Sequence, residues 1–140
     1  MMEKTVEYIK LGVSGIMAYL FGGFDPMFQM LCIVMGIDFA SGILLAMVFH
    51  KSTKSKGGTL SSSAAVKGAV RKVCQLMLVI VITFLSRTIG DDAFCRNTAI
   101  IFFTANECIS ILENMGMMGV SYPKWLRDGL EILLKKQEDK

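Results

Sequence analysis

The chain has 140 residues, of which 53% are hydrophobic and 19% are charged, and its net charge is +3. Its mean hydropathy is +0.52, which excludes an ordinary soluble domain, because such a domain needs polar residues to cover its surface. The apolar residues form runs of roughly 17 to 23 residues, the length of a bilayer-spanning helix. We therefore expect one all-α integral membrane domain, residues 1–140, with three or four transmembrane helices and a C-terminal cytoplasmic amphipathic helix.

The N-terminal segment, residues 5–24, is apolar but contains charges and four glycines. Its uncharged part, residues 11–24, would be about 21 Å long as a helix, which is short for a bilayer core. The segment either lies in the membrane interface or spans the membrane with Glu7 and Lys10 at its edge. Gly22, Gly23 and Pro26 then predict a break before the next helix.

Two clear spans follow. Residues 27–49 form an apolar run with a single charge, Asp38, near the middle, and residues 73–89 form the second run. Between them, residues 50–72 contain bases and no acid. The first part of this segment predicts a flexible loop, and a helix of small residues is expected to begin near Ser62 or Ser63 and to continue into the second span.

The last third of the chain contains a half-polar span, residues 94–118, and an amphipathic helix, residues 123–135. Bases are abundant in the loop after the first clear span and in the tail, and the turn near residue 90 is balanced in charge. The positive-inside rule places the basic loop and the C-terminus in the cytoplasm. Four spans put both termini inside, and three spans put the N-terminus outside; the sequence leaves both open.

Asp38 inside a span costs about 2.5 to 3.5 kcal/mol on insertion scales, so it should face other helices or water. One interpretation is a residue of a pore or ion pathway, and the other is a hydrogen bond between helices. In the second interpretation, small residues nearby allow close helix approach, and the sequence leaves both interpretations open. These predicted packing positions are Gly36, Ala40, Gly42 and Gly68.

The half-polar span has two unlike faces on a helical projection. Its polar arc predicts either the lining of a lumen shared by several copies or a polar seam inside one small bundle. Together with Asp38, the residues of this predicted site are Asn97, Thr104, Glu107, Ser110 and Asn114.

The basic segment predicts contact with anionic lipid of the inner leaflet, or else only an orientation signal. Its bases are Lys51, Lys54, Lys56, Lys67, Arg71 and Lys72. Four cysteines without a C-x-x-C pair indicate neither a disulfide framework nor a zinc site. No nucleophile with an adjacent base, phosphate-binding loop or metal motif is visible, so we expect no enzyme activity, no cofactor, no metal and no nucleic-acid partner.

The chain contains several short motifs in a fixed order, namely DFASGI at 38–43, LSS at 60–62, KGAVRKV at 67–73 and NECISILEN at 106–114, followed by Gly119, Pro123 and Leu126. Together these motifs resemble those of the phage lysis and toxin-secretion holin family. The resemblance implies a homo-oligomer in the bacterial inner membrane that opens a lesion. Its cargo would be a muralytic enzyme (an endolysin) or a toxin, without a requirement for direct binding. The alternatives are a small selective channel or exporter, and a membrane adaptor that recruits a soluble partner through its amphipathic tail.

Overall fold

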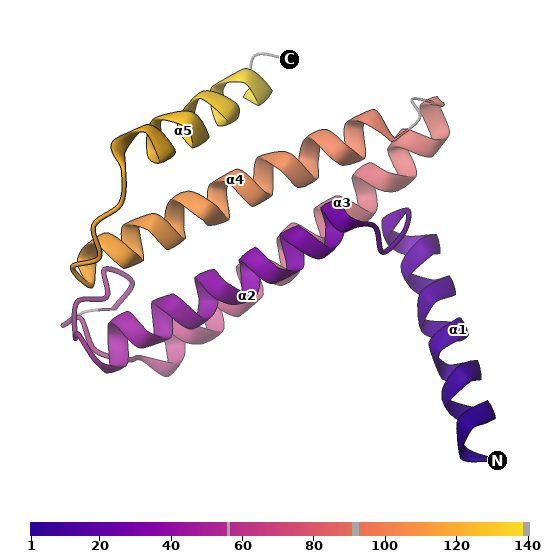
Figure 1. Cartoon of the computed structure of the whole chain (residues 1–140), viewed down its shortest axis with the longest axis horizontal. Coiled ribbons are helices and arrows are strands. Elements are labelled where there is room, and N and C mark those ends of the chain that lie inside the picture. The colour runs from indigo at the N-terminus through magenta and orange to yellow at the C-terminus, as the bar shows by residue number, and fades with distance from the viewer. Residues whose placement is uncertain (56, 91–92, 139–140) are drawn as a thin grey trace.

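The computed structural model describes residues 1–55, 57–90 and 93–138, and this part of the chain contains five α-helices and no strand (Figure 1). The helices are α1 (Met2–Phe21), α2 (Pro26–Met47), α3 (Ser62–Ile89), α4 (Phe94–Met117) and α5 (Lys124–Glu138). The all-α prediction is confirmed for the described residues.

The break between α1 and α2 follows from three local signals at Gly22, Asp25 and Pro26. Gly22 ends α1 with φ +77°, in the left-handed region that glycine adopts at least cost. The carboxylate of Asp25 accepts a hydrogen bond of 2.9 Å from the Phe28 backbone N–H and so caps α2. Pro26, which has no N–H to lose, begins α2.

Three helices form the bundle. α4 packs along both α2 and α3, whereas α2 and α3 contact each other more sparsely, and α5 returns alongside α4 (Figure 1). The apolar core lies toward the α1 end of the bundle and contains Phe21, Phe28, Leu31, Met35, Val79 and Ile100. The half of the bundle next to the basic loop holds a cluster of buried charged and polar residues that includes Asp38, Glu107 and Asn114.

The basic loop folds back on itself at the end of α2. Ser52 donates its backbone N–H to the Gly58 carbonyl at 3.0 Å, and Lys51 donates to the Met117 carbonyl at the end of α4 at 3.5 Å. Gly58 has φ +75°, and a Cβ there would lie 2.1 Å from the His50 carbonyl oxygen. Only glycine fits this position, so the loop shape depends on it.

Among the described residues, α2 and α3 are the two helices that are long and apolar enough to cross a membrane. Their outward faces expose large apolar side chains such as Ile33, Leu44, Met77 and Val81. Lipid would remove the cost of this exposure, which water would not. Whether α1 and α4 also span, giving three or four spans, stays a prediction.

α1 leaves the bundle and points away from it (Figure 1). It is held at its C-terminal end, where the Phe21 ring stacks on Phe28 with centroids 4.4 Å apart. Along the rest of the helix an apolar stripe repeats at intervals of three and four residues and is exposed in the single chain. The stripe consists of Met2, Val6, Ile9, Val13 and Ile16.

Candidate functional site

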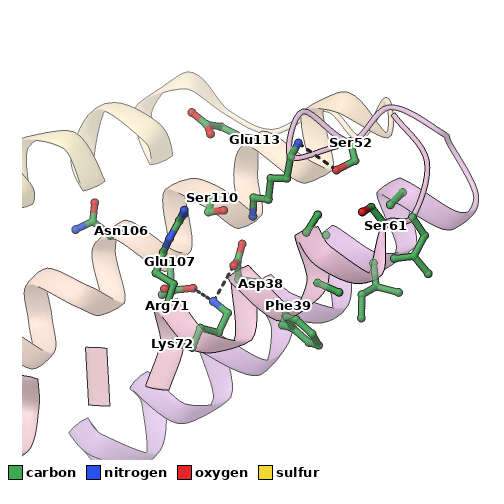
Figure 2. Close-up of a pocket in the computed structure, with 18 of the residues that line it drawn as sticks. Asp38, Phe39, Ser52, Ser61, Arg71, Lys72, Asn106, Glu107, Ser110 and Glu113 are labelled. Carbon is green, nitrogen blue, oxygen red and sulfur yellow. Dashed lines mark hydrogen bonds and ion pairs between the residues drawn. The ribbon is translucent and has the colours of Figure 1, made fainter. Parts of the chain in front are cut away.

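A charged triad lies between α2, α3 and α4, in the half of the bundle next to the basic loop (Figure 2). The ammonium of Lys72 donates to Asp38 Oδ2 at 2.8 Å and also to the carboxylate of Glu107. Asp38 and Glu107 are 5% and 6% exposed, respectively. One cation therefore joins two almost fully buried anions from the two flanking helices.

Helix register brings these three residues to one level. Asp38 lies nine residues before the end of α2, Lys72 ten residues after the start of α3, and Glu107 ten residues before the end of α4. At 1.5 Å per residue each lies about 14 to 15 Å from the same end of the bundle. The alternating direction of the three helices then places the charges together.

A hydrogen-bonded pair extends the triad toward the end of α4. Asn114 donates through Nδ2 to Ser41 Oγ at 2.9 Å and to Asp38 Oδ1 at 3.4 Å, and Ser41 donates to the Asp38 carbonyl at 3.0 Å. Asn114 and Ser41 are both buried. The Asp38 carboxylate thus has partners on both oxygens, as a buried ion requires.

The triad carries a net charge of −1, because two carboxylates share one ammonium. Withdrawing ions from water costs several kcal/mol for each one, and a matched pair in good geometry only offsets that cost. The triad is therefore weak evidence for stability. Its value lies in coupling α2, α3 and α4 through one side chain.

A cavity of about 450 Å³ opens beside the triad, bounded by α2, α3, α4 and the basic loop (Figure 2). Its polar lining includes Lys54, Arg71, Ser110 and Glu113, and its apolar lining includes Phe39. The Gln75 Oε1 atom, also in this lining, is enclosed and has no hydrogen-bond partner among the described residues. A buried acceptor of this kind calls for a donor such as water.

A second ion pair lies at the opposite end of the bundle. The buried guanidinium of Arg96 bonds to both oxygens of Asp25, at 2.7 and 3.2 Å, and donates to the carbonyl of Phe21 at the end of α1. The bond with Arg96 holds the pKa of Asp25 below its usual value. This pair joins α4 to the corner between α1 and α2.

Arg87 of α3 also stabilises the corner between α1 and α2. Its guanidinium donates to the carbonyls of Tyr19 at 2.6 Å and Ala18 at 2.9 Å, near the C-terminal end of α1. Cations are favoured there because the last carbonyls of a helix lack partners within the helix. Two arginines from different helices therefore set the direction in which α1 leaves the bundle.

The structure separates the predicted polar site into two groups. Asp38, Thr104, Glu107 and Asn114 are buried inside the single chain, and Ser110 lines the cavity beside them. Asn97 lies at the other end, where its Oδ1 accepts from Arg96 at 3.0 Å. The chain alone therefore has the arrangement of an internal seam, and the lumen of an assembly stays a prediction.

Some of the predicted bases and small residues lie at the cavity or at helix contacts, and others lie on the exposed surface. Lys54, Arg71 and Lys72 line the cavity, whereas Lys67 is exposed outside it and Lys56 lies outside the described residues. A Cβ on Gly42 would approach Asn114 to 3.8 Å, and one on Gly68 would approach Phe39 to 3.8 Å, so both lie at helix contacts. Gly36 and Ala40 lie on the exposed side of α2.

Sequence reasoning missed the role of Lys72 as the partner of Asp38 and Glu107, because it grouped all bases of residues 50–72 as surface charges. Counting residues from the helix ends would have found it, since the three charges share one depth. The pair of Arg96 with Asp25 was missed because the turn near residue 90 was considered only for its balanced charge. In the described part of the chain, no group of three or more His, Cys, Asp or Glu side chains could hold a metal ion.

Together, the two apolar helices with exposed outer faces and the buried polar cluster indicate a small helical membrane protein. The model of the bacteriophage holin family matches residues 15–135. The chain therefore belongs to the bacteriophage holin family, and the resemblance seen in its motifs is confirmed. This membership supports a holin-like, non-enzymatic role in a membrane.

Relatives align with most of this chain. An uncharacterized protein of Listeria monocytogenes is 33% identical over 127 residues, covering 91% of this chain and 85% of its own length. An uncharacterized protein of Clostridium perfringens is 32% identical over 143 residues, covering 99% and 100%. A probable holin of Bacillus phage phi105 is 29% identical over 123 residues, covering 88% and 84%. No solved structure matches the chain.

Proposed function

We propose that this protein is a holin that forms homo-oligomers in the bacterial cytoplasmic membrane and opens a lesion. A muralytic enzyme or a toxin leaves the cytoplasm through it, which leads to lysis or to export without a signal sequence. Family membership supports the class of function. The basic loop and the C-terminus lie in the cytoplasm in this proposal, following the positive-inside rule.

The observation that carries the proposed mechanism is the burial of the polar side of α4 in the single chain. Glu107 and Asn114 are inside the bundle, on a helix that also carries Thr104 and Ser110. A polar helix face of this kind is satisfied either by partners inside one chain or by water in a lumen shared by several chains. The lesion forms when the polar face of α4 in several copies leaves its partners inside each chain and lines a shared water-filled lumen.

The triad gives this exchange a dependence on membrane voltage. Its net charge of −1 resides on three helices whose relative positions change when the polar face becomes hydrated. A charge that crosses the whole potential couples to it by about 2.3 kcal/mol per 100 mV. Depolarisation therefore shifts the balance between the two arrangements, and accumulation of copies shifts it further.

The proposal is tested by inducing the protein in a bacterium with and without a co-expressed cytoplasmic muralytic enzyme. Culture density, membrane potential and enzyme activity outside the cells are followed together. We expect abrupt depolarisation in both cultures and enzyme release with lysis in the paired culture alone. Depolarisation that passes ions and never the enzyme would contradict the large lesion and would favour a small selective channel.

A further inference from the structure

We propose that α1 is an interfacial helix that lies in the outer leaflet of the membrane, with its apolar stripe toward the lipid chains and its charged residues toward water. The stripe is exposed in the single chain. Figure 1 shows α1 leaving the bundle sideways, at the end opposite the basic loop. The outer side follows from the cytoplasmic position proposed above for the basic loop, which lies at the other end of the bundle.

The corner between α1 and α2 lies at the edge of the bilayer core. α2 has 22 residues and is about 33 Å long, which matches a core of about 30 Å. Asp25 caps the first turn of α2, and Arg96 pairs with Asp25 at that level. Arg87 bonds to the carbonyls of Tyr19 and Ala18 just before the corner. These charged side chains mark the boundary of the membrane, so the end of α1 that joins the bundle lies at the interface.

A return of α1 through the bilayer would place its charged residues in the core. Lys10 lies 11 residues before Phe21, the last residue of α1, which is about 16 Å along the helix axis and close to the middle of the core. Glu7 would lie about 21 Å from the same end, also inside the core. Charged side chains are costly at that depth. A helix in the membrane plane avoids this cost, because its whole length stays at the depth of the interface.

The distribution of residues around α1 fits a helix in the plane of the interface. The apolar stripe occupies one side of the helix, and the charged residues occupy the other side together with one large apolar exception, Leu11. The charged residues are Glu3, Lys4, Glu7 and Lys10. Tyr8 and Tyr19 lie between the two sides, at the level that tyrosine prefers in a membrane interface. This pattern is typical of helices that lie on a membrane.

The stripe is continuous with the apolar core of the bundle. It extends at the same spacing to Leu20, and both Leu20 and Met17 pack against that core. The stripe therefore faces the side of α1 on which the bundle lies, and the charged residues face away from it. The outward face of α3 is apolar up to Leu85 and Ile89, near the same corner. Lipid that covers α3 at this level would also cover the stripe.

The first test measures the depth of α1 residues in the full-length protein. The native cysteines, Cys32, Cys74, Cys95 and Cys108, are replaced by alanine. Single cysteines are then introduced at each position of residues 6–14 and labelled with a nitroxide. The protein is reconstituted in vesicles of phosphatidylcholine and phosphatidylglycerol. The rate at which each label collides with oxygen, which concentrates in the bilayer core, is divided by its collision rate with a water-soluble nickel chelate.

We expect this ratio to oscillate with the period of the helix, with high values at Val6, Ile9 and Val13 and low values at Glu7 and Lys10. A single maximum near Lys10 would show that α1 spans the membrane. A low ratio at every position would place α1 in water. A low ratio at Ile9 together with spin–spin broadening that disappears on dilution with unlabelled protein would show that a second copy covers the stripe. Each of these three results would overturn the proposal.

The second test assigns the leaflet, in the same background without native cysteines. Glu7→Cys on α1 and Lys67→Cys at the basic-loop end of α3 are treated with a membrane-impermeant thiol reagent in intact spheroplasts before the onset of lysis, and again after detergent opens the membrane. We expect Glu7→Cys to react in intact spheroplasts and Lys67→Cys to react only after opening. The reverse result would place α1 on the inner side and overturn the outer leaflet. The depth measurement depends neither on orientation nor on lesion formation, so its failure is distinct from a failure of the proposed function.

Discussion

At the scale of single residues, Lys72 is the side chain on which the polar cluster depends. Among the described residues, it is the one cation that bonds to both Asp38 and Glu107. Without it, two buried carboxylates would face each other with no compensating charge. Loss of either carboxylate would instead leave one matched pair. The two kinds of substitution therefore have unequal effects.

We predict that Lys72→Met lowers the free energy of unfolding by about 3 to 5 kcal/mol, the usual cost of breaking a buried ion pair. Glu107→Gln should cost clearly less, because the Asp38–Lys72 bond of 2.8 Å remains. Unfolding in detergent micelles, followed by circular dichroism, gives both values. The variant with Lys72→Met, Asp38→Asn and Glu107→Gln together should regain much of the loss. A Glu107→Gln effect as large as that of Lys72→Met would contradict the shared role of Lys72.

At the scale of elements, the corner between α1 and α2 depends on the pair of Asp25 and Arg96. Asp25 caps α2 and binds the guanidinium of Arg96 from α4, so one carboxylate serves two helix junctions. Arg96 also bonds to the Phe21 carbonyl and passes close to Gly22, where a Cβ would lie 3.0 Å from its Nε atom. The corner is therefore more firmly held than its loop sequence suggests.

The lowered pKa of Asp25 gives a pH dependence with a defined sign. A carboxyl whose pKa is lower in the folded state stabilises the fold above its unfolded pKa, about 3.9, and loses that contribution as the pH falls through the folded value. We predict that the unfolding temperature of the wild type falls below about pH 4 more steeply than that of Asp25→Asn. Asp128→Asn, on exposed α5, is the control and should follow the wild type. Parallel curves for the wild type and Asp25→Asn would contradict the prediction.

Elements were also the level at which the sequence was most informative. Helix existence followed from the apolar runs, and the break at residues 22–26 followed from two glycines and a proline at the first helical position. The start of α3 at Ser62 followed from the change from a Ser/Gly/Lys loop to small helix-forming residues. These are short-range effects, so a single sequence carries them.

The candidate site was predictable in composition but not in pairing. Asp38 stood out because an acid is costly inside an apolar run, and Glu107 stood out as a member of the polar arc of residues 94–118. Their joint contact with Lys72 depends on how three helices align, and a projection of one helix contains no information about the others. For the same reason the projection put Asn97 in one arc with Glu107, although the two residues lie 15 Å apart along α4 by helix rise. In the folded chain, Asn97 instead contacts Arg96 at the opposite end of the bundle.

At the scale of the whole molecule, the voltage dependence of lesion opening tests the proposed exchange of arrangements. Glu107→Gln removes the net charge of the triad and keeps the Asp38–Lys72 bond. We predict that this variant opens at a different time after induction and responds less to an imposed depolarisation than the wild type. Glu113→Gln, an exposed acid outside the triad, is the control. Unchanged timing and unchanged sensitivity in Glu107→Gln would remove the triad from the voltage response.

The direction of α1 has a consequence for how copies meet in a membrane. A helix of 20 residues is about 30 Å long, and α1 extends away from the bundle for most of that length. When α1 lies in the membrane plane, the area of membrane within reach of one copy is much larger than the cross-section of its helix bundle. Neighbouring copies then contact each other through their α1 helices while their bundles are still separated by lipid. The surface density at which a network of copies first connects is accordingly lower than the density needed for close packing.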